Sequence, residues 1–455
     1  MTTAFAGVPA LTDPRPAAAL ALGERTTASG LRIVAVRKPG VPLAELRLRV
    51  PFLSADTAHP AQATLLSDSL MTGAGPYDRA GLAAAVQALG ADLGVGVDAD
   101  RLIVSGNVLA NETEQLFELL RLILTEPTYA SDEVSTERDR LIERLTIARS
   151  RAGTIASEQL GLRMWGQHPY ALDLPHPEEV SEVTAEQLAG LHEQRVRPGG
   201  SVLIVVGDVD PDALLDQAEA ALGAWAGSCP DGAVPALPAA QGGALLVVDR
   251  PGSVQSSLRM GTDALTRTDD GYPALQLANL VFGGYFSSRW TENIREDKGY
   301  TYGPHSRIDH HALGSTLMFD VEVATEVTAP AMVETRYELG KIASLGVTEA
   351  EVEAVRQYAI GTLALSTSTQ AGLASTLSAL SAHGLGLDWI IDHPARLMAT
   401  TVDKVSAAAA RYFGPARHTA VIVGDAATIT DSLAALGPIE SSSAPVSAGS
   451  EEDGE

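Results

Sequence analysis

The sequence predicts an α+β protein built from two similar halves, each with helices packed on a mostly antiparallel sheet. Two strand-like runs, SVLIVVGD (201–208) and HTAVIVGD (418–425), end in Gly-Asp pairs that lie 217 residues apart, from 207 to 424. A second pair of similar runs is IVAVRKPG (33–40) and LLVVDRPG (245–252). The total of 455 residues leaves each half within the usual size of one domain. These observations indicate an internal duplication.

The first half mixes strands with helices. Alternating apolar residues predict half-buried strands at 31–37 and 43–50. A helical apolar stripe then ends at Gly90, and the run from Val95 to Leu109 predicts further strand. The other expected elements are helices over 112–124, 131–149 and 271–282, strands near 300–324, and helices near 328–344 and 348–364.

Composition shifts divide the chain into five segments. The stretch CPDGAVPALPAAQGG is rich in Pro, Gly and Ala and predicts an extended linker. The low-complexity end, IESSSAPVSAGSEEDGE, predicts disorder. The segments are an N-terminal extension (1–24), a first domain (25–228), the linker (229–243), a second domain (244–434) and a disordered acidic tail (435–455).

The charge balance restricts the partners. A net charge of −25 argues against binding to nucleic acid or to anionic membrane surfaces. It could favour a basic peptide partner, but a solvated acidic surface that keeps the protein in solution is the favoured interpretation. Cys229 is the single cysteine, which excludes an intrachain disulfide, and the N-terminus lacks the pattern of a signal peptide. No apolar run is long enough to span a membrane, so we expect a cytoplasmic protein.

One long run is distinctive: VFGGYFSSRWTENIREDKGYTYG (281–303). It resembles the glycine-rich and Arg/Tyr region of the insulinase/pitrilysin zinc metallopeptidase superfamily, and processing-peptidase-like bacterial subunits in particular. The segments WGQHPYALDLPHPEEVSEVT (165–184), VVGDVDPDAL (205–214) and DRPGSVQSS (249–257) agree with it. The resemblance extends from about Arg25 to Asp431 and implies two homologous metallopeptidase-like domains.

The resemblance also shows what is missing. Active members of the superfamily carry His-x-x-Glu-His on a helix of the first half, with a Glu about 76 residues later as the third zinc ligand. Here the run ATLLSDSLMTGAG (63–75) takes that place, so the motif positions hold Thr64, Ser67 and Asp68, and the third ligand position holds Arg144. A cation repels Zn²⁺, and none of the ten histidines has ligand spacing. We therefore expect no metal in this chain.

The second half keeps an Arg/Tyr pair. Arg295 and Tyr302 match the family pair, which hydrogen-bonds the substrate backbone beside the scissile bond. Gly299 is expected to end the helix in a left-handed conformation, with Tyr302 on the strand YTYG that follows. The alternative is structural, with Arg295 complementing the helix C-terminus and Tyr302 packed as a strand aromatic. Trp290 departs from the aliphatic residue that is usual at its position.

Gly283 and Gly284 have two interpretations. In the non-catalytic processing-peptidase subunit a glycine-rich loop contributes to substrate capture, and the alternative is a helix C-cap.

The resemblance implies a non-catalytic, substrate-binding subunit of a heterodimeric zinc metallopeptidase. The expected partner is a homologous subunit with an intact His-x-x-Glu-His motif, which would carry the zinc, while this chain supplies Arg295 and Tyr302. A peptide would bind as an added strand on a sheet edge. The alternatives are a structural scaffold subunit and a peptide-binding protein without a catalytic role.

Overall fold

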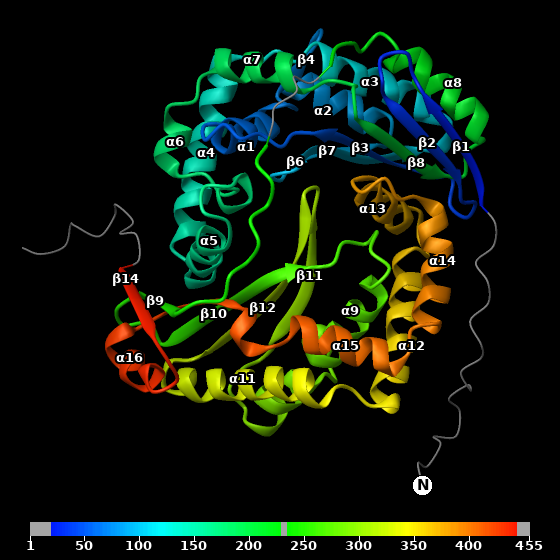
Figure 1. Cartoon of the computed structure of the whole chain (residues 1–455). Coiled ribbons are helices and arrows are strands. Elements are labelled where there is room, and N and C mark those ends of the chain that lie inside the picture. Colours follow the sequence, from blue (N-terminus) through cyan, green and yellow to red (C-terminus); the bar gives the residue numbers. More distant parts are fainter. Residues whose placement is uncertain (1–19, 229–233, 444–455) are drawn as a thin grey trace, which may run out of the picture.

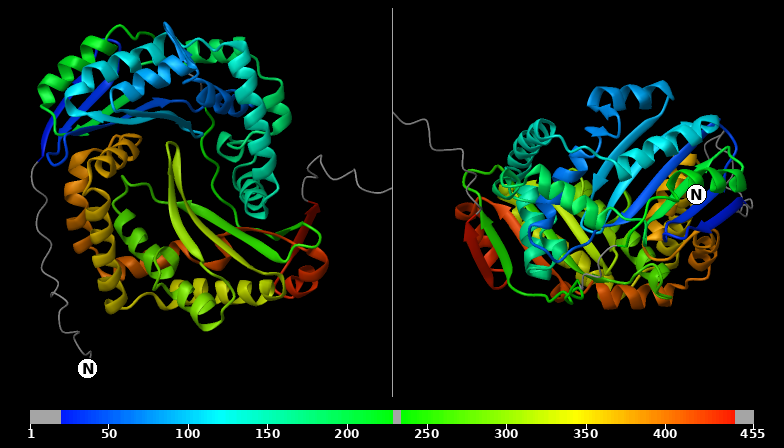
Figure 2. Two further views of the ribbon diagram at one scale, coloured as in Figure 1. Left: turned by 180° about the vertical axis from the view of Figure 1, so that it is seen from behind. Right: turned by 90° about the horizontal axis from the view of Figure 1, so that it is seen from above.

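The structure is a computed structural model that describes residues 20–228 and 234–443 of the chain. Two six-stranded sheets form its two halves, and helices join them at both sides (Figure 1). The view from behind in Figure 2 shows the same arrangement, with the first sheet above and the second below. The expected α+β architecture with two layered bodies is confirmed.

The first sheet has the order β1-β2-β8-β3-β7-β6. Strands β2 and β8 are parallel, and the remaining neighbours are antiparallel. Its strands are β1 (Ala21–Thr26), β2 (Arg32–Arg37), β3 (Leu43–Pro51), β6 (Asp92–Val97), β7 (Arg101–Leu109) and β8 (Val202–Gly207).

The second sheet has the order β11-β12-β10-β13-β9-β14. Its run β9-β13-β10-β12-β11 repeats the order and the directions of β2-β8-β3-β7-β6, as a duplication predicts. Its strands are β9 (Leu245–Asp249), β10 (Gln255–Ala264), β11 (His305–His311), β12 (Gly314–Ala324), β13 (Thr419–Gly424) and β14 (Ile439–Ser443).

Helices cover both sheets. Short strands β4 (Gly73–Ala74) and β5 (Tyr77–Asp78) form a separate hairpin. The helices are α1 (His59–Ser69), α2 (Arg79–Ala88), α3 (Thr113–Thr125), α4 (Ser131–Arg149), α5 (Ala152–Trp165), α6 (Pro177–Ser181), α7 (Ala185–Arg195), α8 (Pro211–Leu222), α9 (Tyr272–Asn279), α10 (Arg289–Thr291), α11 (Thr328–Leu345), α12 (Glu349–Ser366), α13 (Gln370–Ser381), α14 (Leu387–Met398), α15 (Val402–Tyr412) and α16 (Ala426–Ala434).

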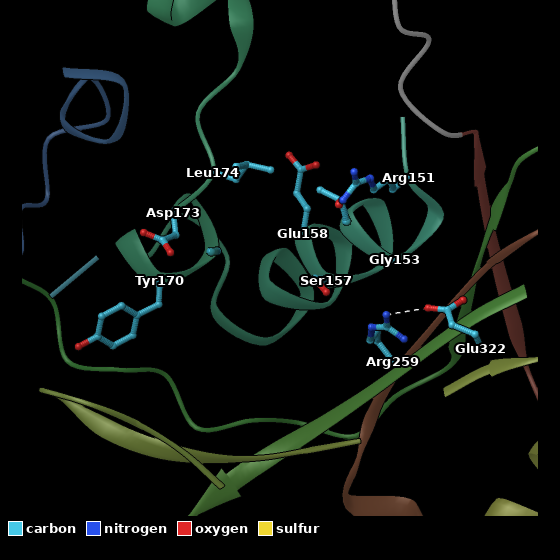
Figure 3. Close-up of a pocket in the computed structure, with 11 residues that line it drawn as sticks. Arg151, Gly153, Ser157, Glu158, Tyr170, Asp173, Leu174, Arg259 and Glu322 are labelled. Atoms are coloured by element: carbon cyan, nitrogen blue, oxygen red, sulfur yellow. Dashed lines mark hydrogen bonds and ion pairs between the residues drawn. The ribbon is translucent and has the colours of Figure 1, made fainter. Parts of the chain in front are cut away.

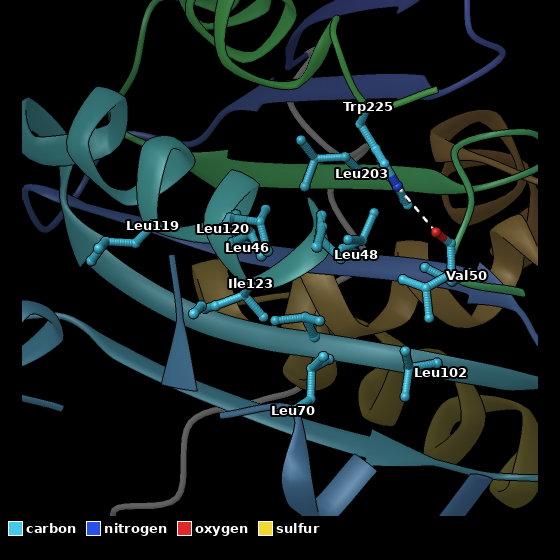
Figure 4. Close-up of a cluster of buried hydrophobic side chains, with 14 of the residues drawn as sticks. Leu46, Leu48, Val50, Leu70, Leu102, Leu119, Leu120, Ile123, Leu203 and Trp225 are labelled. Carbon is cyan, nitrogen blue, oxygen red and sulfur yellow. Dashed lines mark hydrogen bonds between the residues drawn. The ribbon is translucent and has the colours of Figure 1, made fainter. Parts of the chain in front are cut away.

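The central strands are apolar on both faces because helices cover each face. On β8, Leu203 and Val205 join the main core of the first half, which also contains Trp225 (Figure 4). Ile204 and Val206 of the same strand face the opposite way, into a separate cluster. This explains why the 201–208 run is continuously hydrophobic instead of alternating.

Each half sends one helix onto the sheet of the other half. Helix α13 of the second half packs on β3 and β8, and its Leu377 and Leu380 share a buried cluster with Val34 of β2 and Ile204 of β8. Helix α5 of the first half packs in the same way on β10 and β13 of the second sheet. Figure 1 shows α13 beneath the first sheet and α5 reaching down to the second. The halves are thus reciprocally interlocked.

Close approach of α5 depends on a small residue in β10. A Cβ atom at Gly261 would lie 2.6 Å from the sulfur of Met164 on α5, which is closer than real Cβ contacts. A glycine therefore lets the helix of one half lie against the sheet of the other.

Two segment boundaries differ from expectation. The N-terminal extension was expected to include residue 24, but β1 begins at Ala21. The tail from 435 was expected to be disordered, but Ile439–Ser443 forms β14 and pairs in parallel with β9. Backbone hydrogen bonds hold this edge strand, so its polar side chains can face water. Residues 444–455 lie outside the described part.

No helix within the described residues is both long enough and apolar enough to cross a membrane.

Because α13 packs on the sheet of the other half, we expect a large loss of stability when an apolar side chain of α13 is shortened. Leu377 is 3% exposed in the cluster between α13 and the first sheet. Leu377→Ala should lower the free energy of unfolding by about 2–5 kcal/mol, because it leaves a cavity. Urea unfolding followed by circular dichroism measures the change. Leu365→Ala, at a position that is 75% exposed, should alter it by less than about 0.5 kcal/mol, and equal effects would contradict the assignment.

Candidate functional site

The positions of the missing zinc motif lie on α1, and the third ligand position lies on α4. The two helices pack together, and Asp68 meets Arg144 across them, with Oδ2 and Nη2 2.6 Å apart. The structure thus brings two of the four degenerate positions into direct contact. An ion pair stands where the resemblance places two ligands of a metal.

The other two positions are also unsuited to zinc. The hydroxyl of Thr64 donates a hydrogen bond to the carbonyl of Pro60, 2.8 Å away, and Ser67 is buried. Burial raises the pKa of Asp68, and the opposing effect of Arg144 is smaller. Within the described residues, no cluster of three or more His, Cys, Asp or Glu side chains could hold an ion. The donor set present here does not fit zinc.

Arg295 lies in the last turn of a helical segment that ends at a left-handed glycine, as expected. It belongs to a π-helical segment (Glu292–Asp297), and Gly299 follows in the left-handed conformation with φ of +67°. The amide of Gly299 donates to the carbonyl of Arg295. The guanidinium of Arg295 lies 4.5 Å from the ring centre of Phe286, and its Nε lies 3.3 Å from Glu296.

Tyr302 is placed differently from expectation. The strand predicted at YTYG begins only at His305, so Tyr302 lies in the preceding loop, with 95% of its surface exposed. Pro304 has no N–H group to donate to the ladder, which explains the later start. Thr301 anchors this loop by donating to the carbonyl of Glu322 on β12. No hydrogen bond joins Arg295 to Tyr302 in the described residues.

The glycine pair is explained by packing. Gly283 and Gly284 end a π-helical segment (Leu280–Gly284) that continues α9. A Cβ atom at Gly283 would lie 2.9 Å from both Ser306 and the Trp290 ring. Trp290 is fully buried and donates through its indole N–H to the hydroxyl of Thr335, 3.0 Å away. Close packing against Trp290 therefore accounts for Gly283, whereas the C-cap of this segment is Tyr285 and neither glycine has a positive φ.

A cavity of about 650 Å³ lies between the two halves. Figure 3 shows Tyr170 and Asp173 from the segment after α5 on one side of it, and Arg259 and Glu322 from the second sheet on the other. Arg259 and Glu322 are joined at 2.7 Å. The loop that carries Tyr302 is hydrogen-bonded to Glu322, so it lies at an edge of this wall.

The tip of the β11–β12 hairpin is hydrogen-bonded to residues of the first half. Tyr170 donates to Asp100 Oδ1 at 2.6 Å, the amide of Ala312 donates to Oδ2 of the same carboxylate at 2.9 Å, and the amide of Leu313 donates to the Tyr170 hydroxyl. The ring of His311 lies 4.5 Å from that of Tyr170. This network ties the second sheet to the first half.

Sequence reasoning missed these cavity residues. The segment 165–184 was used only as a sign of family resemblance, although HPYALD places an aromatic and an acid close together. Asp98 and Asp100 were not singled out. Their contact with Tyr170 and Asp173 depends on the tertiary fold, so only the sequence signal Asp-x-Asp could have indicated them.

The assignment of the motif positions predicts that zinc binding can be restored. The variant Thr64→His, Ser67→Glu, Asp68→His, Arg144→Glu should bind one Zn²⁺ per chain, measured by elemental analysis after dialysis. The triple variant that keeps Arg144 also keeps the native Glu143. It should bind at least about 10-fold more weakly, since even the loss of a group that only hydrogen-bonds to a ligand costs about 10–100-fold in metal affinity. Equal binding by the two variants would show that position 144 is assigned wrongly.

Asp173 predicts a pH-dependent stability difference. Burial, followed by the charges of Asp98 and Asp100, raises its pKa from 3.8 to about 6. Ionised Asp173 therefore destabilises the fold above about pH 6, and the penalty disappears as the pH falls toward 4. Asp173→Asn should melt at a higher temperature than the wild type at pH 7.5 and show a smaller difference at pH 4.5. Asp92→Asn, at the opposite end of β6 from Asp98, should show no such trend.

Comparison with known proteins agrees with the geometry. Residues 182–358 match the family model of the Peptidase M16 inactive domain. A protein of Mycobacterium tuberculosis named as an uncharacterized zinc protease is 26% identical over 420 residues, which are 90% of this chain and 94% of that protein. The probable inactive metalloprotease YmfF of Bacillus subtilis is 27% identical over 222 residues, covering 47% of this chain and 50% of that protein.

Solved structures share the fold. A structure from Pseudomonas fluorescens, described as a peptidase M16 inactive domain, superposes with a TM-score of 0.81 at 23% identity and covers 89% of this chain and 98% of that one. The periplasmic protease PqqL of Escherichia coli superposes with a TM-score of 0.74 at 17% identity, over 92% of this chain and 48% of PqqL. The chain is thus similar to the M16 metallopeptidases, which are the insulinase/pitrilysin type, and its residues 182–358 match their inactive-domain model, while its zinc-motif positions hold other residues.

Proposed function

We propose that the chain is the non-catalytic, substrate-binding subunit of a heterodimeric zinc metallopeptidase. A homologous partner with an intact His-x-x-Glu-His motif carries the metal and the general base, and this chain supplies Arg295 and Tyr302 to the partner's site. The observation that carries the proposal is the 95% exposure of Tyr302. A large aromatic residue without a packing role in its own chain is available to another molecule.

Arg295 supports the same interpretation. Its guanidinium lies over Phe286, itself 63% exposed, instead of being locked into a buried ion pair. Guanidinium and phenol groups are both hydrogen-bond donors, suited to the carbonyl oxygen of a bound peptide as negative charge develops on it. Their work here is to bind and orient the peptide backbone. The ion pair of Asp68 and Arg144 leaves the chemistry to the partner.

The length of one relative, PqqL, is consistent with two chains. The superposition covers 92% of this chain but only 48% of PqqL, which is described as a protease. Two chains of this size therefore match one PqqL. The partner subunit would take the place of the half of PqqL that this chain leaves uncovered.

The edge of the first sheet offers a place for the peptide. Within residues 20–228 and 234–443, strand β6 pairs with β7 alone, so no strand lies along its other edge. A Cβ atom at Gly94 would meet nothing within 4 Å, and the residues that follow the strand, Asp98 and Ala99, line a cavity between the halves. Binding through backbone hydrogen bonds tolerates many side chains, which suits a broad peptide specificity.

Reconstitution with the zinc-bearing homologue tests the role of the pair. Arg295→Ala and Tyr302→Phe should each lower kcat/KM of the mixed subunits by about 10²–10³-fold, because a donor to the developing oxyanion is lost. Peptide cleavage is the measurement. Tyr337→Phe, at a tyrosine that is 56% exposed, is the matched control and should leave activity unchanged.

Other outcomes discriminate between the functions. Undiminished activity of the Arg295→Ala, Tyr302→Phe double variant would remove the assigned role. A stable complex that cleaves no peptide would favour a scaffold subunit. Peptide affinity of the isolated chain without activity in any pairing would favour a peptide-binding protein.

A further inference from the structure

A buried arginine faces the second cavity between the halves. Arg49 lies on β3, a central strand between β7 and β8, and is only 7% exposed. Its Nε has no hydrogen-bond acceptor within the described residues. The cavity that it lines has a volume of about 390 Å³ and is also lined by Arg267, His310, His311 and His383. A guanidinium held on a rigid strand without a partner is a costly feature of a fold.

The second half contributes another guanidinium to the same cavity. Arg267 follows β10, lies 5.9 Å from the ring centre of Trp389, and has an Nε that is also buried without an acceptor in the described part. His383, at the end of α13, lies near both arginines: burial first, and then Arg267 and Arg49, lower its pKa. The two arginines therefore face the same region from opposite halves. The histidine between them is neutral near pH 7.

Three of the four carboxylates that line the cavity are already engaged with other donors, and Asp173 is the fourth. Asp98 accepts from Arg101 at 3.0 Å, Asp100 accepts from Tyr170 and Ala312, and Asp309 accepts from Arg307 at 3.0 Å. Each has donors of its own, and none of them is hydrogen-bonded to Arg49 in the described residues. The lining groups that lack a hydrogen-bond partner in the described residues are therefore the Nε–H donors of Arg49 and Arg267.

We propose that this cavity binds a carboxylate group between Arg49 and Arg267. The planar fork of a guanidinium matches the two oxygens of a carboxylate. A volume of about 390 Å³ is in the range of small-ligand sites and fits a terminal residue, but not a long peptide. The source is either the C-terminal carboxylate of a peptide, which rests on the proposed function, or a free dicarboxylic acid. This site is separate from Arg295 and Tyr302.

Binding measurements on the full chain distinguish the two sources. The probes are a pool of fluorescein-labelled random decapeptides with a free C-terminus, the same pool amidated, and succinate. The free pool should bind at least about 10-fold more tightly than the amidated pool, as expected for loss of a charged hydrogen bond. Arg49→Met and Arg267→Met should abolish that difference. Arg37→Met, at an arginine whose side chain is 54% exposed, should preserve it.

The variants are also informative about folding. Arg49→Met replaces a buried, unpaired charge with an apolar chain of similar length, so its melting temperature should equal or exceed that of the wild type. A fall in melting temperature would mean that Arg49 already has a stabilising partner, which would overturn the site.

The remaining outcomes separate this site from the proposed function. Equal binding of both peptide pools, with no effect of Arg49→Met and no binding of succinate, would overturn the site and leave the peptide-binding function standing. Succinate binding that Arg49→Met abolishes, with no affinity for either pool, would support the site with a free acid as its ligand and contradict peptide binding.

Discussion

The reciprocal packing of α5 and α13 is the constraint on which the rest of the structure depends. Each helix buries its apolar face on the sheet of the other half, so neither sheet is covered on both faces without the partner half. Because the central strands are apolar on both faces, separation of the halves would expose Val34, Ile204 and Val421 to water. The cavities between the halves, and the groups that line them, are held in place by this exchange.

The contact between α1 and α4 does not involve a metal in this structure. Asp68 and Arg144 join α1 to α4 through a partly exposed ion pair that is worth only about 0–1 kcal/mol. The pair therefore adds little stability, and the apolar residues Leu65, Leu66 and Leu141 hold the two helices in the core. Such a scaffold does not require a metal to fold, so the motif positions were free to change without loss of the architecture.

Sequence patterns predicted what depends on local periodicity. The hydrophobic runs at 201–208 and 418–425 became β8 and β13, and Gly299 ends its helix with a positive φ. The exchange of α5 and α13 was not predictable, because an amphipathic pattern shows that a face is buried but not which sheet covers it. Strand β14 was not predicted, because its residues are mostly polar and backbone pairing with β9 holds the strand in place. The cavity residues come from segments far apart in the chain, so no local pattern joins them.

Two residues violate local rules in opposite ways. Tyr302 is a large aromatic side chain left in water, and Arg49 is a charge left in the interior. Natural sequences depart from such consistency mainly at functional sites, since the departure lowers stability and persists only where binding compensates for it. The degenerate zinc positions show no such tension, because Asp68 and Arg144 satisfy each other. Among the residues that line the cavity, Arg49 and Arg267 are the ones with a buried Nε that lacks an acceptor in the described part of the chain. An exposed aromatic residue and two buried guanidinium groups are features that a bound ligand would compensate.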